Sequence, residues 1–419
     1  MKLKPELTAK KNTACRYCGS SRLTKFLSLG HHPPSDNFIR PDQIAKEVRY
    51  PLEVYFCESC YLVQLLDVVS AEVLFDNFLY LSSNSKALKS HYAQLAQILI
   101  KRFHLKKGDV VVDIGCNDGI LLHGYTLPGV VRVGVEPSKN VADIAIAAGF
   151  EVEKDFFNKK IASRIVKKYG TAKIATATNV FAHVDDIGSF VDTLLILLGK
   201  DGVFVIEAPY LIDTIDKTLF DTIYHEHLCY LSLTPLVPFL KKHDLEVFDI
   251  ERVPIGASGP ALRIFIQPKI GGRKIERSVE TMLRNEKKWG VGDIDRYLGY
   301  AQRVEKVKKD TIKYIKKIKN SGARLGGYGA PAKGSTLLNY FEITPSMVEC
   351  IAETNPVKQG LVTPGSHIPI VSEEEFLKRM PEYALLLSWN YLDFFLEKSD
   401  YIKKGGKFLV PLPKPCIVP

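Results

Sequence analysis

The sequence has no run of about 18 or more apolar residues, and this absence excludes a predicted membrane-spanning helix. Its first residues, from Met1 to Lys11, are polar and rich in lysine, and they lack the apolar centre of a secretory signal. A glycine-rich stretch near residue 330 lacks the GxxxxGK[ST] spacing of a P-loop, so ATP hydrolysis is not expected. We therefore expect a cytoplasmic protein with no membrane partner.

The composition that remains is ordinary for a globular protein. The chain has 419 residues, 46% hydrophobic and 25% charged, and this length suggests two to three domains with a large core. The formal net charge of +10 favours anionic partners. Nucleic acids and phosphorylated small molecules both meet that condition, so charge alone does not choose between them.

Four of the eight cysteines, Cys15, Cys18, Cys57 and Cys60, form two CxxC pairs. In a reducing compartment such pairs are typical of a metal site rather than of disulfides. Four thiolates match tetrahedral structural zinc, and Gly19 suits the tight turn of a zinc knuckle. Two unrelated reduced pairs are the alternative. A thioredoxin-like role is disfavoured, because no βαβ pattern surrounds either pair.

A doubly wound α/β domain is predicted from about Lys107 onward. An apolar strand, 110–114, runs into a turn of pattern DxGxNDG, which disfavours a dinucleotide because it is not GxGxxG. A glycine turn between strand and helix lets the backbone approach a ligand closely and aims helix N–H groups at it. The candidate ligand contacts in this turn are Asp113, Gly115, Asn117 and Asp118.

The ends of the following strands add side chains to this candidate site. The second strand ends in Glu136, whose carboxylate can accept hydrogen bonds from both hydroxyls of a ribose. The third ends at Asp155 and Phe156, where a carboxylate can accept from an exocyclic amine and a ring can stack on a base. The fourth leads into Asn179 and then His183.

The connector before this domain, residues 67–106, has an aromatic stretch followed by a predicted helix, Lys86 to Phe103, with apolar residues at helical spacing. Two interpretations stay open. The segment is either a packed connector or a cap in which Tyr80 and Ser83 help to close a ligand pocket.

The run Tyr224-His225-Glu226-His227 gathers two imidazoles, a carboxylate and a phenol. It follows the fifth predicted strand, and insertions at such strand ends border the ligand crevice of open α/β sheets. Histidine is the usual general base near neutral pH, and a carboxylate can orient it. An extended segment would put His225 and His227 on one face, whereas a helix would pair Tyr224 with His227. The alternative is a solvated loop with one structural histidine.

The DxGxNDG turn with acids at the next two strand ends resembles class I S-adenosylmethionine-dependent methyltransferases, although a Rossmann-like domain with another ligand is the alternative. With the CxxC pairs before this core, IYHEHLCYLS after it and a second nucleotide-like domain at the end, the chain resembles the sugar C-methyltransferases. The best-known members of that family are the TDP-sugar 3-C-methyltransferases of deoxysugar pathways. The similarity runs from Cys15 to about Pro413.

The resemblance implies an α/β protein whose class I methyltransferase core carries a zinc-binding β module before it and a second Rossmann-like domain after it. The implied parts are a zinc-binding module at 1–66, a helical connector at 67–106, a methyltransferase domain at 107–270, a helical linker at 271–320 and a Rossmann-like domain at 321–419 that binds the substrate nucleotide. The implied cofactors are S-adenosylmethionine and structural Zn²⁺.

The resemblance also implies roles for single residues. His227 would be the base, Tyr224 would lie beside the sugar, Glu226 would support the base, and His183 would lie near that site. Relatives often have two tyrosines in a YxYxSS stretch, whereas here Phe78 replaces the first and only Tyr80 remains.

The C-terminal part contains a second glycine-rich turn before a predicted helix, and its lysine can meet a phosphate. The resemblance makes this the arm that holds the nucleotide diphosphate of the substrate, and a purely structural domain is the alternative. The expected substrate contacts are Tyr224, His225, Arg263, Tyr328, Gly329, Ala330, Lys333, Asn355 and Lys358.

These features predict a methyltransferase that acts on carbon in a nucleotide-linked 4-keto-deoxysugar, at C3, through an enolate formed by a base. A sugar O-methyltransferase is the alternative. A zinc-ribbon RNA methyltransferase is less favoured, because no NPPY-like motif follows the fourth strand and no basic patch is interleaved with aromatic residues. We therefore expect a nucleotide-diphosphate sugar as the partner, and no nucleic acid.

Overall fold

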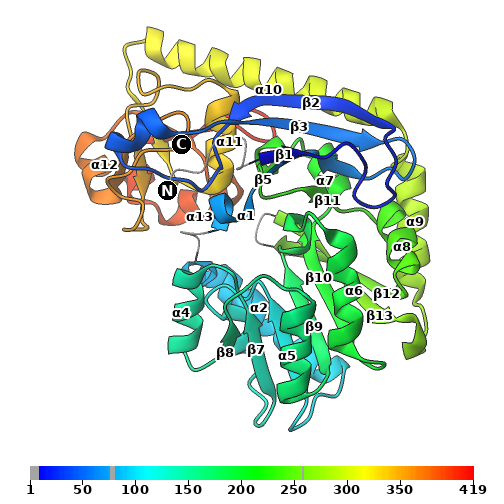
Figure 1. Cartoon of the computed structure of the whole chain (residues 1–419). Coiled ribbons are helices and arrows are strands. Elements are labelled where there is room, and N and C mark those ends of the chain that lie inside the picture. Colours follow the sequence, from blue (N-terminus) through cyan, green and yellow to red (C-terminus); the bar gives the residue numbers. More distant parts are fainter. Residues whose placement is uncertain (1–8, 76–80, 257–258) are drawn as a thin grey trace.

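The computed structural model describes residues 9–75, 81–256 and 259–419 of the chain (Figure 1). The described strands form four sheets, of two, four, seven and six strands. In Figure 1 the long helix α10 (Ile294–Asn320) runs along the N-terminal strands β2 and β3 and reaches the C-terminal part, while the central sheet lies on the other side of those strands. Within the described residues, the helices are too short or too polar to cross a membrane.

The N-terminal part, which carries the CxxC pairs and is called here the cysteine module, is built on a sheet of order β11-β4-β3-β2. In β3 the side chains of Tyr50, Leu52, Val54 and Phe56 are buried and alternate with half-buried ones, as expected for a strand with one face on a core. The strands are β2 (Leu23–His32), β3 (Tyr50–Cys57), β4 (Val63–Leu65) and β11 (Cys229–Tyr230), with β1 (Ala9–Lys11) and β5 (Asp67–Val69) paired beside them and a 3-10 helix η2 (Pro41–Lys46).

Strand β11 comes from the segment just after His227, so the cysteine module and the central domain share a sheet. This sharing was not visible in the sequence, because β11 has only two residues. A two-residue strand is too short to show any periodicity.

The central sheet has the order β12-β13-β10-β9-β6-β7-β8, with β6 to β10 parallel and β13 and β12 antiparallel at one edge. The strands are β6 (Val110–Ile114), β7 (Val131–Val135), β8 (Glu151–Glu153), β9 (Ala172–Thr178), β10 (Val203–Pro209), β12 (Leu245–Gly256) and β13 (Gly259–Pro268).

Helices cover both faces of this sheet. In β10, Val203 and Val205 pack on one side with residues of α2, whereas Phe204 and Ile206 pack on the other with residues of α5 and α6. The helices are α1 (Ala71–Phe75), α2 (Lys86–Arg102), α3 (Ile120–Gly124), α4 (Lys139–Ala147), α5 (Lys159–Tyr169), α6 (Ile187–Leu198), α7 (Leu211–Asp216) and α8 (Leu233–Lys242), with 3-10 turns η3 (Ser82–Asn84), η4 (Phe181–His183), η5 (Phe220–Thr222) and η6 (Lys269–Gly271).

The C-terminal sheet has the order β16-β15-β14-β17-β18-β19, parallel except for the last strand. This confirms the predicted second doubly wound fold. Its elements are β14 (Leu325–Tyr328), α11 (Ala332–Tyr340), β15 (Ile351–Glu353), β16 (Ile370–Ser372), α12 (Glu373–Arg379), β17 (Tyr383–Leu386), η7 (Trp389–Tyr391), α13 (Leu392–Lys398), α14 (Asp400–Lys403), β18 (Lys407–Val410) and β19 (Cys416–Val418).

Helices α9 (Arg277–Trp289) and α10 join the central and C-terminal sheets. One side of α10 is apolar and faces the core, because Val304, Val307, Ile315 and Ile318 are all buried. Tyr297 of α10 packs against Phe26 and Phe56 of the cysteine module, with ring centroids 5.3 and 5.0 Å apart. The linker helix is therefore part of the core and not a free tether.

Candidate active site

A cavity of about 1610 Å³ lies where the three parts of the chain meet. The carboxyl ends of β6, β7 and β9 open into it, as is usual for ligand sites in open α/β sheets. The YHEH run and the second glycine turn contribute to other walls. The predicted site residues in its lining are Asp113, Gly115, Asn117, Glu136, Phe156, Asn179, His183, Tyr224, Glu226, His227, Ala330, Lys333, Asn355 and Lys358.

The YHEH run is neither extended nor helical but forms a turn, in which the N–H of His227 donates to the carbonyl of Tyr224 at 2.9 Å. The turn brings the rings of Tyr224 and His227 together, with centroids 4.0 Å apart. The side chain of His225 is not part of this ring pair and contacts Tyr50 and Pro51 of β3 instead. This pairing is the one expected for a helix, produced here by a single turn.

His227 lines the cavity and is held by its backbone neighbours. Its Nδ1 lies 2.7 Å from the carbonyl oxygen of Thr222. Because a carbonyl can only accept, Nδ1 must carry the proton, which leaves the lone pair on Nε2. Burial lowers the pKa of His227 to about 4, with the Thr222 contact partly opposing that shift. The ring is therefore a neutral base at neutral pH, with its tautomer fixed.

The ring of His183 stacks on that of His227 with centroids 5.2 Å apart. Burial, and secondarily the charge that His227 would carry, lowers the pKa of His183 to about 3. Two stacked imidazoles in one buried site resist protonation together. On its other face His183 stacks on Phe75, at 6.1 Å.

Glu226 does not support His227 as expected, because Thr222 makes the contact with the ring nitrogen instead. The Glu226 carboxylate accepts from the hydroxyl of Ser35, at 3.4 Å to each oxygen. Burial raises the pKa of Glu226 to about 7, and the charge of nearby Asp36 contributes to that rise. Glu226 is thus a buried carboxyl that faces the cysteine module.

His225 lies away from the cavity, so it is not retained as a substrate contact. Its Nε2 lies 3.2 Å from the carbonyl oxygen of Pro51, and its ring packs edge-on against Tyr50 at 5.9 Å. It is fully buried, and burial lowers its pKa to about 4. His225 is a structural histidine that ties the YHEH turn to β3.

In the first glycine turn, Glu136 binds the backbone. Its two oxygens accept from the N–H groups of Asn117 and Ser138, both at 2.9 Å. A carboxylate has about four lone-pair sites, so acceptor capacity remains for a ligand hydroxyl. Asp113 accepts from the hydroxyl of Thr176 at 2.6 Å, and burial raises the pKa of Asp113 to about 7.

The connector is bound to this turn through its backbone. The side-chain oxygen of Asn117 accepts from the N–H of Ser82 at 2.9 Å, and Asp118 accepts from the N–H of Ser83 at 3.0 Å. Asp118 and Ser83 are not in the cavity lining, so they fix the connector and are not retained as ligand contacts. Tyr80 and Phe78 lie outside the described residues.

Asp155 is exposed and lies outside the cavity lining, where it accepts from the N–H of Phe156 at 2.8 Å. The ring of Phe156 is 41% exposed and lines the cavity, so it can stack on a base without help from Asp155. Asn179 adopts φ +57° and donates to the hydroxyl of Tyr92 at 3.2 Å. It also lines the cavity.

The second glycine turn brings two lysines to the cavity. The Nζ of Lys333 donates to Asn390 at 2.5 Å, lies 3.9 Å from Asp221 and sits 4.1 Å from the ring centroid of Trp389. Burial lowers the pKa of Lys333 to about 8, and Asp221 partly offsets that effect. Lys358 donates to Asp36 and to the carbonyl of Ala330, both at 3.0 Å.

Three expected substrate contacts lie elsewhere. Arg263 is buried in the central sheet, where it donates to Glu207 at 2.9 Å and to Glu251 at 3.0 Å. Tyr328 donates to Glu373 and packs in an aromatic cluster of the C-terminal core. Gly329 shapes the turn without lining the cavity. These side chains satisfy internal partners, so we do not retain them as ligand contacts.

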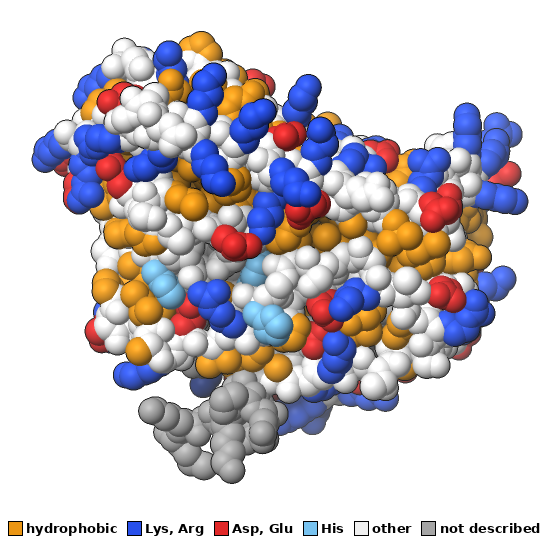
Figure 2. All heavy atoms as spheres, turned by 90° about the horizontal axis from the view of Figure 1, so that it is seen from above, with side chains coloured by type: hydrophobic (Ala, Val, Ile, Leu, Met, Phe, Trp, Pro, Cys, Tyr) orange, Lys and Arg blue, Asp and Glu red, His pale blue; other side chains and the backbone are white. Residues whose placement is uncertain are grey.

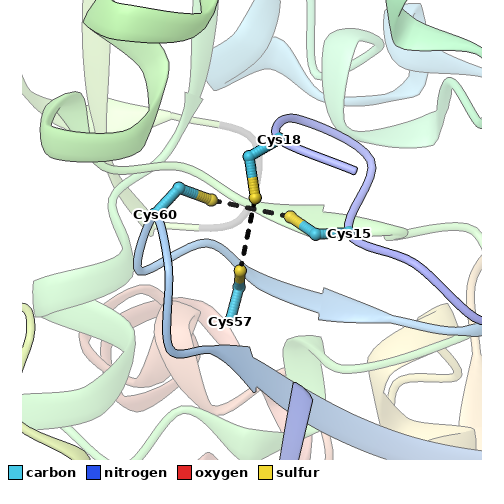
Figure 3. Close-up of side chains that lie close together, drawn as sticks. All are labelled: Cys15, Cys18, Cys57 and Cys60. Atoms are coloured by element: carbon cyan, nitrogen blue, oxygen red, sulfur yellow. Dashed lines mark hydrogen bonds between the residues drawn. The ribbon is translucent and has the colours of Figure 1, made fainter. Parts of the chain in front are cut away.

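The four sulfurs of Cys15, Cys18, Cys57 and Cys60 lie within 4.8 Å of one another. Figure 3 shows them converging from two loops, with Cys15 next to Cys60 at 3.5 Å and Cys18 next to Cys57 at 3.6 Å. All four cysteines are free, so the cluster is not two disulfides. Four soft thiolates around one point are the donor set of a closed tetrahedral zinc site.

Several cavity residues were missed from the sequence. Glu353, at the end of β15, accepts from the N–H of Ala330 at 2.8 Å, and its place matches that of Glu136, so the same strand-end pattern could have found it. Asp36 could not be predicted, because it lies in an irregular loop without a sequence pattern. Thr222 could not be predicted either, because it contacts His227 through its backbone carbonyl.

Comparisons with known proteins follow the same three parts. Family models match at residues 15–75 (“Putative zinc binding domain”), at 88–250 (“Methyltransferase domain”) and at 256–413 (“C-methyltransferase C-terminal domain”). The C-methyltransferase NovU from Streptomyces niveus is 32% identical over 406 residues, which is 96% of each chain. The chain belongs to the C-methyltransferase family.

Solved structures similar to part of this C-methyltransferase include a SAM-dependent methyltransferase from Anabaena variabilis, with 17% identity, a TM-score of 0.34, and coverage of 43% of this chain and 85% of that one. A second, from Clostridium acetobutylicum, has 12% identity, a TM-score of 0.34, and coverage of 43% and 91%.

The C-methyltransferase depends on S-adenosylmethionine, and its first glycine turn fits that donor. Glu136 keeps free acceptor capacity where a ribose would lie, and the exposed ring of Phe156 offers a stacking face. Asp113 and Glu136 are carboxyl groups on the same cavity wall, suited to a cationic ligand. Zinc likewise fits the four thiolates, whose closed shell leaves the metal no catalytic position.

Proposed function

We propose that this C-methyltransferase acts on a nucleotide-linked 4-keto-deoxysugar and methylates C3, the carbon beside the keto group. The observation that carries the proposal is the neutral imidazole of His227, whose Nε2 lone pair is left free by the Thr222 contact and whose ring lines the cavity between the two glycine turns. The proposal goes beyond the family assignment by naming the substrate, the base and the carbon.

Methylation of carbon requires a carbon nucleophile. A keto group makes the neighbouring C–H acidic, and an imidazole can remove that proton with the electron pair passing into an enolate. His227 takes the proton on Nε2 and so leaves a carbon nucleophile at C3, which would accept the methyl group while the thioether of the spent donor leaves with the electron pair of the broken S–C bond. S-adenosylmethionine supplies that methyl group when it is bound. Holding the two carbons in line is a task of proximity, for which a cavity between domains is suited.

Tyr224 is the residue that we propose stabilises the enolate oxygen. Its ring lies 4.0 Å from that of His227, and it lines the same cavity. A phenol can donate a hydrogen bond to an oxygen that gains negative charge in the transition state. His183, stacked on His227 and lining the same cavity, is the competing base.

Lys333 and Lys358 are the proposed contacts of the nucleotide diphosphate. Both line the cavity, and their side chains are 11% and 8% exposed. Each lysine faces a carboxylate, Asp221 or Asp36, so its positive charge is partly compensated within the protein. Partly desolvated ammonium groups bind phosphate more strongly than exposed ones do.

The decisive experiment follows the C3 proton. The enzyme would be incubated in D₂O with a 4-keto-6-deoxysugar nucleotide and without methyl donor, and C3 deuteration would be followed by NMR. We expect exchange by the wild type and its loss in His227→Asn. A sugar O-methyltransferase would show no exchange at C3 in this incubation and would still methylate the sugar once S-adenosylmethionine is added, and that pair of results would contradict the proposal.

An RNA substrate is the less favoured candidate. Helix α10 has lysines on its exposed side, but Lys306, Lys308 and Lys309 pair with Asp310, Glu342 and Glu305. On the face in Figure 2, acidic side chains are likewise scattered among the basic ones. A gel shift with RNA across a salt series would test this, and we expect no binding at physiological salt.

A further inference from the structure

Arg16 connects the cysteine cluster to the cavity. It follows the ligand Cys15 directly, and its side chain is only 2% exposed. Its Nε donates to Asp185 at 3.0 Å, and its Nη1 donates to the side-chain oxygen of Gln64 at 3.2 Å and to the carbonyl of Leu65. One guanidinium therefore joins the loop after Cys15 to two other segments, strand β4 and the residues that follow η4.

Asp185 is the end of this connection in the central domain. It lies two residues after His183 and lines the cavity. Besides Arg16, Asn12 donates to it at 2.8 Å and Lys10 pairs with it at 2.6 Å, so all three donors come from the cysteine module. Burial alone would raise the pKa of Asp185, but Lys10 and Arg16 outweigh burial and hold it below its usual range.

A second connection reaches His227 through β4 and β11. The side-chain oxygen of Gln64 accepts from both the backbone N–H and the Nη1 of Arg16. Gln64 lies opposite Cys229 in the sheet. The N–H of Leu65 donates to the carbonyl of Leu228 at 3.0 Å, and the N–H of Leu228 donates to the carbonyl of Ala182 at 2.8 Å. Leu228 is next to His227 and Ala182 is next to His183.

We propose that Arg16 is a positioning residue, through which the zinc-bound cysteine module holds the stacked imidazoles of His183 and His227 in place for proton removal. The two connections converge on the residues beside those rings. Bound zinc would fix Cys15 and hence the start of the Arg16 side chain, while the sheet fixes Gln64. The zinc module then acts on the chemistry at a distance, without a metal contact to the substrate.

The inference rests on the proposed role of His227, so the test includes a measurement that does not depend on turnover. Arg16→Gln, Arg16→Lys and Asp185→Asn would be compared in the zinc-loaded enzyme. Arg22→Gln is the matched control, since Arg22 belongs to the same module but is 69% exposed and pairs with Glu58. Zinc content, S-adenosylmethionine affinity, kcat and KM would be measured with the ring ¹⁵N signals of His183 and His227.

We expect Arg16→Gln to keep its zinc and its S-adenosylmethionine affinity, to lose roughly 10–100-fold in kcat with little change in KM, and to shift both ring signals. Arg16→Lys should keep a higher kcat than Arg16→Gln, because lysine keeps the positive charge although it lacks the several fixed N–H donors of the guanidinium. Asp185→Asn should act in the same direction, and the double variant should lose less than the two single losses combined. Arg22→Gln should behave as wild type.

Native kcat and unmoved ring signals in both Arg16→Gln and Asp185→Asn would overturn the inference. So would a loss of zinc and cofactor affinity in proportion to kcat in both variants, because that would assign the contact to folding alone. Ring signals that move while kcat stays native would uphold the connection and overturn instead the role of His227 as the base.

Discussion

The two glycine turns beside the cavity are built alike, although they belong to different sheets. Gly115 follows β6 and has φ +70°, and Gly329 follows β14 and has φ +79°. A Cβ on either would lie only 2.4 Å from a neighbouring side-chain atom, of Val180 or of Ser388. Both positions therefore require glycine for conformation and for space.

The hydrogen bonds of the two turns also correspond. Each glycine N–H donates to the carbonyl just before an acid at the end of the next strand, Gly115 to Val135 at 2.7 Å and Gly329 to Ala352 at 2.9 Å. The acids, Glu136 and Glu353, each accept from two backbone N–H groups. The donors are Asn117 and Ser138 for the first, and Ala330 and Asn355 for the second.

The turns differ in the charges that they bring to the cavity. The first brings carboxyls, including Asp113, and the second brings Lys333 and Lys358. Under the proposed function, the sulfonium cofactor would bind at the first turn and the substrate diphosphate at the second. The comparison teaches that the backbone of such a turn provides the shape of a nucleotide site, whereas nearby side-chain charges choose the nucleotide.

The largest expected effect comes from the residue between the two turns. If binding is divided between them, His227→Asn should leave both affinities unchanged and lower kcat by roughly 10²–10⁴, because only general-base assistance is lost. Turnover of the keto-sugar nucleotide and calorimetric titration with each ligand would be measured. His225→Asn is the control, since its ring binds Pro51 outside the cavity.

His183 supplies the outcome that would contradict this expectation. Near-native turnover in the His227 variant, together with an inactive His183→Asn enzyme, would transfer the role of base to His183. If His227→Asn lost affinity for S-adenosylmethionine, His227 would contribute to cofactor binding. The cofactor would then not be bound by the first turn alone, as the comparison requires.

Alanine at the two glycines tests the comparison directly. Gly115→Ala should weaken S-adenosylmethionine binding and spare the nucleotide, and Gly329→Ala should do the reverse. A side chain in the left-handed region costs about 1–3 kcal/mol, and the close contact with Val180 or Ser388 adds to that cost. Each variant would be titrated with both ligands. If one variant lost affinity for both ligands equally, the two turns would not be separate binding sites.

A crossed pair of side-chain variants tests the difference in charge. Glu136→Ala should weaken S-adenosylmethionine by about 1–3 kcal/mol, because ribose hydroxyls lose an acceptor. Lys333→Met should weaken the nucleotide diphosphate by a similar amount and leave the cofactor unaffected. If Glu136→Ala binds S-adenosylmethionine as tightly as wild type, Glu136 is not the ribose ligand.

The sequence predicted the strands and the first turn well, since both depend on short stretches of chain. The DxGxNDG pattern and the acid one strand later brought Gly115 and Glu136 to the same cavity wall. The apolar spacing of the predicted helix at Lys86 to Phe103 corresponds to α2, in which Leu88, Tyr92, Leu95 and Leu99 are buried.

The direction of single side chains could not be predicted, because partners far along the chain decide it. His225 turns toward Pro51, which is 174 residues earlier, and Arg263 turns toward Glu207 on a neighbouring strand. Tyr328 follows the rule of a buried strand and enters the core, although its neighbours in the turn border the cavity. Periodicity carries no information on such long-range pairs.

The smallest expected effect is a difference in pH dependence between the turns. Burial lowers the pKa of Lys333 to about 8, so its ammonium is charged at pH 7 and mostly neutral at pH 9. A bound diphosphate would favour the charged form, so binding takes up a proton and affinity falls as pH rises through that range. We expect roughly a three- to tenfold loss of nucleotide affinity between pH 7 and pH 9. S-adenosylmethionine affinity, measured in parallel, should be the same in the wild type and in Lys333→Gln at each pH. Lys333→Gln should remove the pH dependence, and a wild-type affinity that is level from pH 7 to pH 9 would mean that Lys333 does not contact the diphosphate.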